Sequence, residues 1–338
     1  MTLLQSCACG IDVHAHVVPE HFPAYLKGAP PADWPSTAPA HECLRHVMVK
    51  GRVYRTVSDR CWSAPKRIAD MNGMRVRVQA LSPMPELLST WMEAEPAAEL
   101  LRYINDQIAA FVDEGAGRFV GLGAVPLQDL DLAIAEMRRV VSELGFAGVE
   151  IGSNINGRPI GAPELEPFFE AAEELGAAIF VHALRPAGMD RLVGPAQLQQ
   201  VLAYPTDVGL AAASVITSNL VVRHPRLRIA FSHGGGTLRM LLPRLEEGWK
   251  VFPALQESIS ESPLSQARKL FADTLVYDGS TLRCLLGIFG ETQLMLGTDY
   301  PFNFHERHPV ERVEAAFSDQ DLRDRLIYGN AAAFLGVH

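Results

Sequence analysis

Residues 227–249 read LRIAFSHGGGTLRMLLPRLEEGW, and this stretch has the form that recurs along most of the chain. A β-prone apolar run, Leu227–Phe231, is followed by a loop with three glycines and then by an amphipathic segment, Thr237–Trp249. A short continuous apolar run is typical of a buried parallel strand, whereas apolar positions three and four residues apart are typical of a helix. We therefore interpret the stretch as one strand–loop–helix unit.

Similar runs occur both before and after this stretch. The predicted strands are Gly10–Val13, Val76–Leu81, Phe119–Val125, Gly148–Ile151, Ala178–Val181, Leu227–Phe231, Leu275–Tyr277 and Gln293–Leu296. Helical patterns alternate with them, which predicts a parallel sheet with right-handed crossovers. Eight strands are the number that closes a (β/α)8 TIM barrel. A doubly wound open sheet is the alternative, but the Gly-rich phosphate turn expected after an early strand is absent.

One region interrupts the alternation. Residues from Val17 to about Ser63 are rich in proline and contain the β-prone run Val47–Val57. We predict a small β-subdomain inserted after the first strand, over the end of the barrel where substrates bind. The whole chain, residues 1–338, is otherwise expected to be a single barrel, since α/β barrels commonly exceed 200 residues.

Composition excludes several classes of protein. The 338 residues include 30 basic and 39 acidic side chains, giving a net charge of −9, whereas a general nucleic-acid binder needs a basic face. No apolar run reaches the roughly 18 residues that span a membrane, and the start, MTLLQSCACG, does not resemble a signal peptide. The cysteines are an odd, scattered set that predicts reduced thiols in a cytoplasmic protein. They are Cys7, Cys9, Cys43, Cys61 and Cys284.

Metal-binding side chains end four of the predicted strands. His14 and His16 are two residues apart, so they face the same side of a strand. His182, His233 and Asp299 follow three other strands, and all strand ends of a barrel meet at one mouth. We predict that His14, His16, His182 and Asp299 bind one divalent metal ion. Three imidazoles and a carboxylate suit Zn²⁺, with Mn²⁺ or Fe²⁺ as alternatives, and leave a position for water.

His233 has a different predicted role. It precedes three glycines that allow close approach of the backbone, and a neutral imidazole is suited to deprotonate water. The alternative is that His233 is a fourth imidazole ligand. His-Gly-Gly-Gly also occurs in lipase-like hydrolases, but the Gly-x-Ser-x-Gly motif that accompanies it there is absent. Asp12 could support a ligand imidazole or lie buried beneath the site.

Four motifs resemble the decarboxylating branch of the amidohydrolase superfamily. The resemblance extends over nearly the whole chain, and the last two motifs together are specific for this branch. Hydrolytic members often have a carboxylated lysine on the fourth strand that bridges two metals, and the absence of lysine in Gly148–Gly152 implies a one-metal site. The motifs are Ile11–His16 (IDVHAH), Val125–Ala133 (VPLQDLDLA), Phe231–Gly236 (FSHGGG) and Met295–Phe302 (MLGTDYPF).

The resemblance implies further roles. His233 matches the catalytic histidine, and Arg55 falls where the family has a carboxylate-binding arginine. Arg244 falls where the family has a second arginine that crosses a dimer interface, which implies a homodimer. The family has Pro-Trp after the strand-five histidine, whereas this chain has Ala-Leu-Arg185 after His182, so Arg185 is a further candidate for binding a substrate carboxylate.

Together these observations predict a carbon–carbon lyase: a metal-dependent, non-oxidative decarboxylase of an aromatic or muconate-semialdehyde carboxylic acid, with no organic cofactor. The family suggests two routes, one in which water adds to a conjugated double bond before CO₂ leaves, and one in which Asp299 protonates the carbon directly. Both stay open. The alternatives are a metal-dependent hydrolase or hydratase acting on a lactone or unsaturated diacid, and a metal-binding protein without activity.

Overall fold

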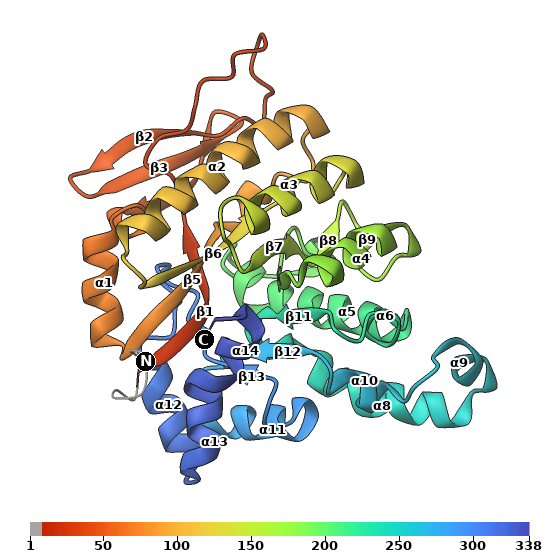
Figure 1. The fold of residues 1–338 in the computed structure, drawn as a ribbon. Helices are drawn as coiled ribbons and strands as arrows, with labels where there is room; N and C mark the ends of the chain where they lie inside the picture. Colours follow the sequence, from red (N-terminus) through yellow and green to blue (C-terminus); the bar gives the residue numbers. More distant parts are fainter. Residues whose placement is uncertain (1–8, 338) are drawn as a thin grey trace.

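Eight parallel strands form a barrel in the computed structural model, which describes residues 9–337 (Figure 1). In the order of hydrogen-bonded neighbours they are β1 (Gly10–Val17), β5 (Val76–Pro83), β6 (Phe119–Ala124), β7 (Gly148–Gly152), β10 (Ala178–His182), β11 (Arg228–Phe231), β12 (Phe271–Asp273) and β13 (Leu294–Met295). The first and last strands meet where the Val13 amide donates to the Leu296 carbonyl at 2.9 Å. The prediction of a (β/α)8 barrel is confirmed.

Helices surround the barrel (Figure 1). Each long helix buries an apolar stripe; in α2, Leu100, Ile104 and Ile108 are fully covered. Asp129 begins α3 by accepting a hydrogen bond from the Leu132 amide at 3.0 Å. The longer helices are α1 (Ala64–Gly73), α2 (Ala94–Glu114), α3 (Leu130–Ser142), α4 (Glu166–Leu175), α5 (Tyr204–Thr217), α8 (Leu238–Val251), α11 (Gly279–Phe289) and α12 (Pro309–Ala316). The shorter ones are α6 (Leu220–Arg223), α7 (Ser232–Gly235), α9 (Pro253–Ser258), α10 (Pro263–Ala267), α13 (Gln320–Asp324) and α14 (Asn330–Leu335).

Apolar side chains fill the interior of the barrel. Ile11, Leu122, Phe180 and Met295 come from four strands and pack in one buried cluster, which Phe334 of α14 joins. Burying each such side chain stabilises the fold by about 1.5–3 kcal/mol. This apolar floor excludes water, so the polar side chains at the strand ends sit on a rigid support.

The seventh strand does not lie where the sequence predicts it. The prediction of a strand at Leu275–Tyr277 is wrong, because β12 covers Phe271–Asp273. The Val276 amide bonds the Thr274 carbonyl at 2.9 Å, so the chain turns directly after the strand. Leu275 and Val276 are apolar because they line a cavity above the barrel. The shift places Asp273 at the end of a barrel strand.

A small antiparallel sheet lies between β1 and α1. It consists of β2 (Ser36–His41), β3 (Leu44–Val49) and β4 (Arg52–Ser58), next to α2 in Figure 1. Val47 and Val57 are buried and anchor it to the main core. A second, two-stranded sheet is formed by β8 (Asn154–Ile155) and β9 (Arg158–Pro159). The first of these sheets brings Tyr54 and Arg55 to the mouth of the barrel.

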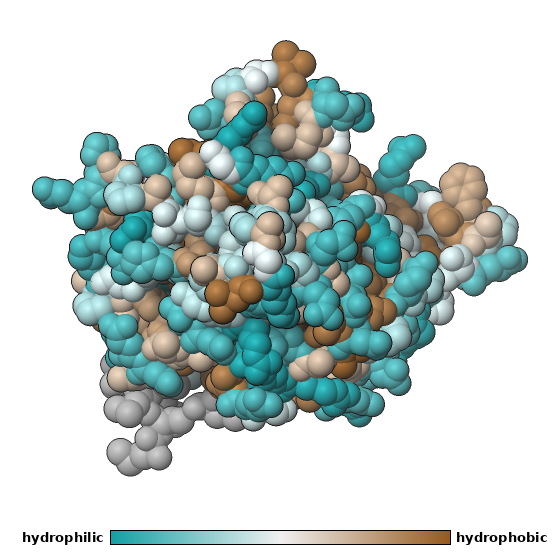
Figure 2. Space-filling model, turned by 90° about the horizontal axis from the view of Figure 1, so that it is seen from above, coloured by the Kyte–Doolittle hydropathy of each residue, from teal (hydrophilic) through white to brown (hydrophobic). Residues whose placement is uncertain are grey.

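The cysteines differ in state. Cys9 is disulfide-bonded, so the expectation of reduced thiols throughout is wrong, because an odd and scattered set of cysteines does not exclude a single pair. Cys43, Cys61 and Cys284 are free, and Cys7 lies outside the described residues. Within residues 9–337 no helix is both long and apolar enough to cross a membrane. Figure 2 shows a face on which apolar side chains occur in scattered groups among polar ones.

Candidate metal centre and active site

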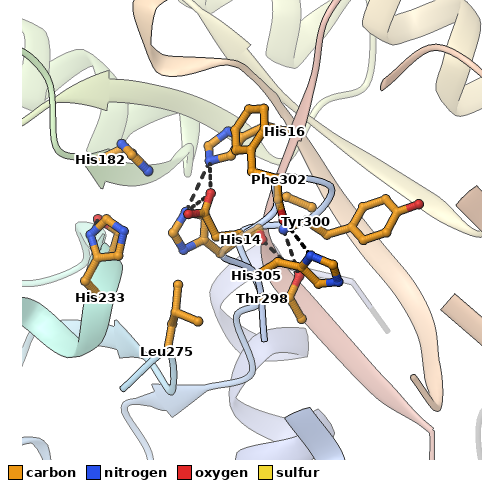
Figure 3. Close-up of polar contacts among 12 residues, drawn as sticks. His14, His16, His182, His233, Leu275, Thr298, Tyr300, Phe302 and His305 are labelled. Carbon is orange, nitrogen blue, oxygen red and sulfur yellow. Dashed lines mark hydrogen bonds and ion pairs between the residues drawn. The ribbon is translucent and has the colours of Figure 1, made fainter. Parts of the chain in front are cut away.

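Three imidazoles and one carboxylate converge at the carboxyl ends of the barrel strands (Figure 3). One donor atom each of His14, His16, His182 and Asp299 lies within 4.8 Å of the others. The Nε2 atoms of His14 and His16 are 3.2 Å apart, and His16 Nε2 is 3.1 Å from Asp299 Oδ1. The prediction that these four side chains meet at one point is confirmed.

The other ring nitrogen of each histidine faces an acceptor, and this fixes how the ring is oriented. A proton on Nδ1 leaves the Nε2 lone pair free to point into the centre of the cluster. The three Nδ1 contacts are His14 to Asp273 Oδ2 at 2.7 Å, His16 to the Pro83 carbonyl at 3.1 Å, and His182 to the Ala183 carbonyl at 2.8 Å. The protein therefore presents three imidazole lone pairs to one point, as a metal ion requires.

The cluster fits a divalent cation. His182 Nε2 is buried and makes no hydrogen bond to the described residues, which is costly unless the atom has a ligand. Asp299 is held in a left-handed conformation (φ 62°) with its amide bonded to the His14 carbonyl at 2.8 Å. Nitrogen and carboxylate donors together suit Zn²⁺, Mn²⁺ or Fe²⁺. An orphaned donor in a converging set is the observation that best supports a metal site.

The electrostatics of the cluster also favour a cation. Burial opposes protonation of His14, but its hydrogen bond to Asp273 and the charge of Asp299 raise its pKa to about 9. Burial and the neighbouring imidazoles hold the pKa of His182 well below its usual range. The carboxylates thus stabilise positive charge at the centre, and a divalent ion can replace the proton there.

His233 lies beside this cluster and not within the four-residue ligand group. Its ring centroid is 5.1 Å from that of His182 and 5.3 Å from that of His14. Burial and the charge on His14 lower the pKa of His233 to about 4, so its imidazole is neutral near pH 7. A Cβ on Gly236, at φ 58°, would lie 2.0 Å from the Pro205 carbonyl, so only glycine permits this turn.

Asp273 is a site residue that the sequence prediction missed. Its buried carboxylate accepts hydrogen bonds from His14 Nδ1 at 2.7 Å, the His233 amide at 3.0 Å and the Gly234 amide at 2.7 Å. It therefore links a predicted metal ligand to the turn that carries His233. The available signal was an aspartate ending the short run Phe271–Asp273, the same pattern as at the other strand ends.

Two other buried carboxyl groups have different surroundings. Asp12 contacts no imidazole; it accepts from the His14 amide at 3.0 Å and from Thr298 Oγ1 at 2.6 Å, which fixes β1 to the segment that carries Asp299. Of its two predicted roles, burial beneath the site is the one observed. Glu150 on β7 lies 3.7 Å from His16 Nδ1, and burial raises its pKa to about 8.

A cavity of about 390 Å³ lies above the cluster and is lined by His182, His233 and Asp299. Arg55 also lines it, with its guanidinium 4.3 Å from the centre of the Phe302 ring. Phe302 in turn stacks on His16, with centroids 5.4 Å apart. One aromatic ring thus separates Arg55 from the metal ligands. A carboxylate bound to Arg55 would lie in the cavity, next to the cluster.

The other two predicted arginines lie outside the cavity lining. Arg244 is exposed on α8. Arg185 is exposed, forms an ion pair with Glu86 at 3.0 Å and lies 3.1 Å from the centre of the Trp91 ring. The predicted contact between Arg185 and the substrate therefore stays a prediction.

Comparisons with known proteins agree with one another. The family model described as Amidohydrolase matches residues 11–337. The 2-amino-3-carboxymuconate-6-semialdehyde decarboxylase of Dictyostelium discoideum is 35% identical over 97% of this chain and 91% of its own length. The gamma-resorcylate decarboxylase of Rhodococcus jostii is 27% identical over 79% of this chain and 85% of its own. The solved structure of 5-carboxyvanillate decarboxylase from Sphingomonas paucimobilis has a TM-score of 0.74 at 27% identity, covering 81% of this chain and 83% of that one.

Proposed function

Because this chain belongs to the amidohydrolase family, we propose that it is a metal-dependent, non-oxidative decarboxylase, a carbon–carbon lyase that acts on an aromatic or muconate-semialdehyde carboxylic acid. The single observation that carries the proposal is the convergence of three imidazoles and Asp299 beneath a cavity that also holds Arg55. The relatives described above are all named as decarboxylases, which supports this reaction over hydrolysis. The proposal treats the chain as one catalytic barrel with its inserted sheet.

Four side chains would hold the metal: His14, His16, His182 and Asp299. We propose Zn²⁺, because imidazole nitrogen with one carboxylate oxygen suits it. When bound, the ion supplies a Lewis acid that stabilises negative charge developing on the substrate.

The protein's own groups bind the acid and manage the proton. Arg55 would hold a substrate carboxylate through a forked, charge-assisted contact. As the carbon–carbon bond breaks, CO₂ leaves and the electron pair stays on carbon, which must then gain one proton. His233 lies at the cavity and can relay one proton from bulk solvent to this carbon, so that the carboxylate and one proton give CO₂ and the protonated product. Asp299 is the alternative donor.

Assembly is a second part of the proposal. Helix α8 extends from the barrel together with α9 (Figure 1) and exposes Met240, 72% accessible, beside Leu241. Val201 and Leu202, near the start of α5, are also exposed. Such side chains fit a homodimer in which α8 faces the partner and Arg244 reaches the second cavity. We also propose a cytoplasmic location. The free thiols of Cys43, Cys61 and Cys284 favour this location, whereas the disulfide bond of Cys9 does not.

The reaction is tested by metal analysis and by CO₂ release. Purified protein is expected to contain about one transition metal ion per chain, as measured by elemental analysis that separates zinc, manganese and iron. The metal-loaded protein, given a panel of hydroxybenzoates and muconate semialdehydes, is expected to release CO₂, and chelator treatment should abolish it. A ring-opened or hydrated product without CO₂ would support a hydrolase or hydratase. Absence of metal even after reconstitution would remove the basis of the proposal.

The shared-site dimer is tested by mixing variants. Arg55→Ala and Arg244→Ala are each expected to raise KM for a carboxylated substrate by about 10-fold or more, because each removes a charged contact. Mixed and allowed to exchange subunits, the two variants should recover part of the activity, because some dimers then carry one intact site. Activity that does not return, in a mixture shown by light scattering to contain exchanged dimers, contradicts a contribution from Arg244 across the interface.

A further inference from the structure

A fully buried arginine lies behind the metal cluster and has no part in the proposed reaction. Arg67 belongs to the buried face of α1, together with Ala64 and Met71, and its exposed fraction is 0%. Arginine is almost never fully buried unless it is paired with an opposite charge. Within residues 9–337, however, Arg67 forms no ion pair with a carboxylate. Its burial therefore has to be explained by other contacts.

Three oxygen atoms in different directions accept hydrogen bonds from the Arg67 guanidinium. They are the Arg60 carbonyl at 3.2 Å, Gln79 Oε1 at 2.8 Å and the His16 carbonyl. Gln79 in turn donates from Nε2 to Asp12 Oδ2 at 2.7 Å, so one amide connects the buried cation to a buried carboxylate. The guanidinium is thus hydrogen-bonded on several sides, and Asp12 balances its charge through Gln79.

The same guanidinium lies against the segment that carries Asp299. Its central carbon is 4.8 Å from the centre of the Tyr300 ring, within the range of a cation–π contact. Tyr300 directly follows Asp299, and its side chain points away from the metal cluster (Figure 3). The Tyr300 hydroxyl donates to Asp70 of α1 at 2.8 Å. Helix α1 therefore holds Tyr300 at the ring through Arg67 and at the hydroxyl through Asp70.

Arg67 thus contacts two chain segments that bring ligands to the metal cluster. These segments meet where the His16 amide donates to the Tyr300 carbonyl at 2.7 Å, and Arg67 binds the carbonyl of this His16 and the ring of this Tyr300. Across the junction, His16 Nε2 and Asp299 Oδ1 are 3.1 Å apart. A metal site needs its ligands within about 0.2 Å of the preferred distances, so a small shift of either segment would disturb the cluster.

We propose that Arg67 is a positioning residue of the metal centre, which holds His16 and Asp299 at the spacing that one divalent ion requires. It acts through the His16 carbonyl and the Tyr300 ring, and it lies outside the cavity lining. A guanidinium suits this task because its donors lie in one plane while its flat face packs on an aromatic ring, whereas a lysine ammonium has neither property. The inference rests on the metal site of the proposed function.

Cobalt binding tests the inference without relying on turnover. Co²⁺ is the probe because its visible absorption depends on the number and arrangement of its ligands, and competition with a chelator gives its affinity. We expect Arg67→Met to bind Co²⁺ about 10-fold more weakly than the wild type and to show an altered visible spectrum. Arg67→Lys keeps the charge but not the planar fork, so it should lose less stability than Arg67→Met and still show an altered spectrum.

Arg139→Met is the matched control variant. Arg139 is also nearly buried, with an exposed fraction of 9%, and its side chain bonds Glu136 at 2.7 Å and Asp106 at 2.8 Å. Neither partner belongs to the metal cluster. Arg139→Met should therefore lower the unfolding temperature but keep the Co²⁺ affinity and the visible spectrum of the wild type.

Two outcomes would overturn the inference. The first is a wild-type Co²⁺ affinity and spectrum in Arg67→Met or, if that variant does not fold, in Arg67→Lys. The second is a loss of Co²⁺ affinity that Arg139→Met reproduces for the same decrease in unfolding temperature, which would make Arg67 a residue of the fold alone. Failure of the proposed reaction is distinguishable, because no acid would then release CO₂ although Co²⁺ binding still depended on Arg67.

Discussion

Replacing His233 by alanine is expected to lower CO₂ release by more than about 100-fold while the metal content stays close to that of the wild type. The reason is geometric: His233 lies beside the metal cluster and lines the cavity, but the four converging donors do not include it. Elemental analysis and a CO₂ assay on the same preparation measure the two quantities together. The expected pattern is a loss of kcat with the metal retained.

Two further variants serve as controls for His233→Ala, one at a metal ligand and one at the surface. His182→Ala removes the buried Nε2 atom, which has no hydrogen-bond partner among the described residues, and it should lower both metal content and activity. His21→Ala changes a side chain that is 66% exposed, and it should alter neither. If His233→Ala loses its metal as His182→Ala does, His233 is a fourth ligand and the role assigned to it is wrong.

The metal cluster could be predicted from sequence because it depends on simple geometry. Residues two apart on a strand point to the same face of the sheet, and the parallel strands of a barrel all end at one rim. This geometry places His14, His16 and His182 close together. Asp273 was not predicted in this way, because Leu275–Tyr277 is a stronger β-prone run than Phe271–Asp273. Those residues are apolar because they line the cavity, and burial beside a cavity leaves the same signature as burial in a sheet.

The side chains over the cavity could not be placed from sequence. On α8, Arg239 lines the cavity, whereas Arg244, five residues later and about 140° further around the helix, does not. Spacing alone does not say which of the two faces the cavity. In the inserted sheet, Val47 pairs with Arg55 while Met48 pairs with Val53, so Tyr54 is an extra, bulged residue. The bulge lets the adjacent Tyr54 and Arg55 both line the cavity, which strict alternation would forbid.

Replacing Asp273 by asparagine is expected to weaken metal binding by about 10–100-fold and to lower kcat even when the metal is saturating. The carboxylate orients His14 through Nδ1 and also accepts the amides of His233 and Gly234. An asparagine side chain has one acceptor oxygen and no charge, so it cannot satisfy these donors together, and each buried donor left unpaired costs about 1–3 kcal/mol. Competition with a chelator measures the affinity, and CO₂ release at saturating metal measures kcat.

Asp12→Asn separates this effect from simple destabilisation. Asp12 is equally buried and also bonds a backbone amide of His14, but it contacts no imidazole. Asp12→Asn should therefore lower the thermal stability of the protein. For the same decrease in stability, it should weaken metal binding less than Asp273→Asn does. If Asp273→Asn keeps wild-type affinity and kcat, or if both variants lose affinity in proportion to their stability, Asp273 only supports the fold. A loss of both affinity and kcat specific to Asp273 would mean that one carboxylate positions the metal ligand and the catalytic histidine together.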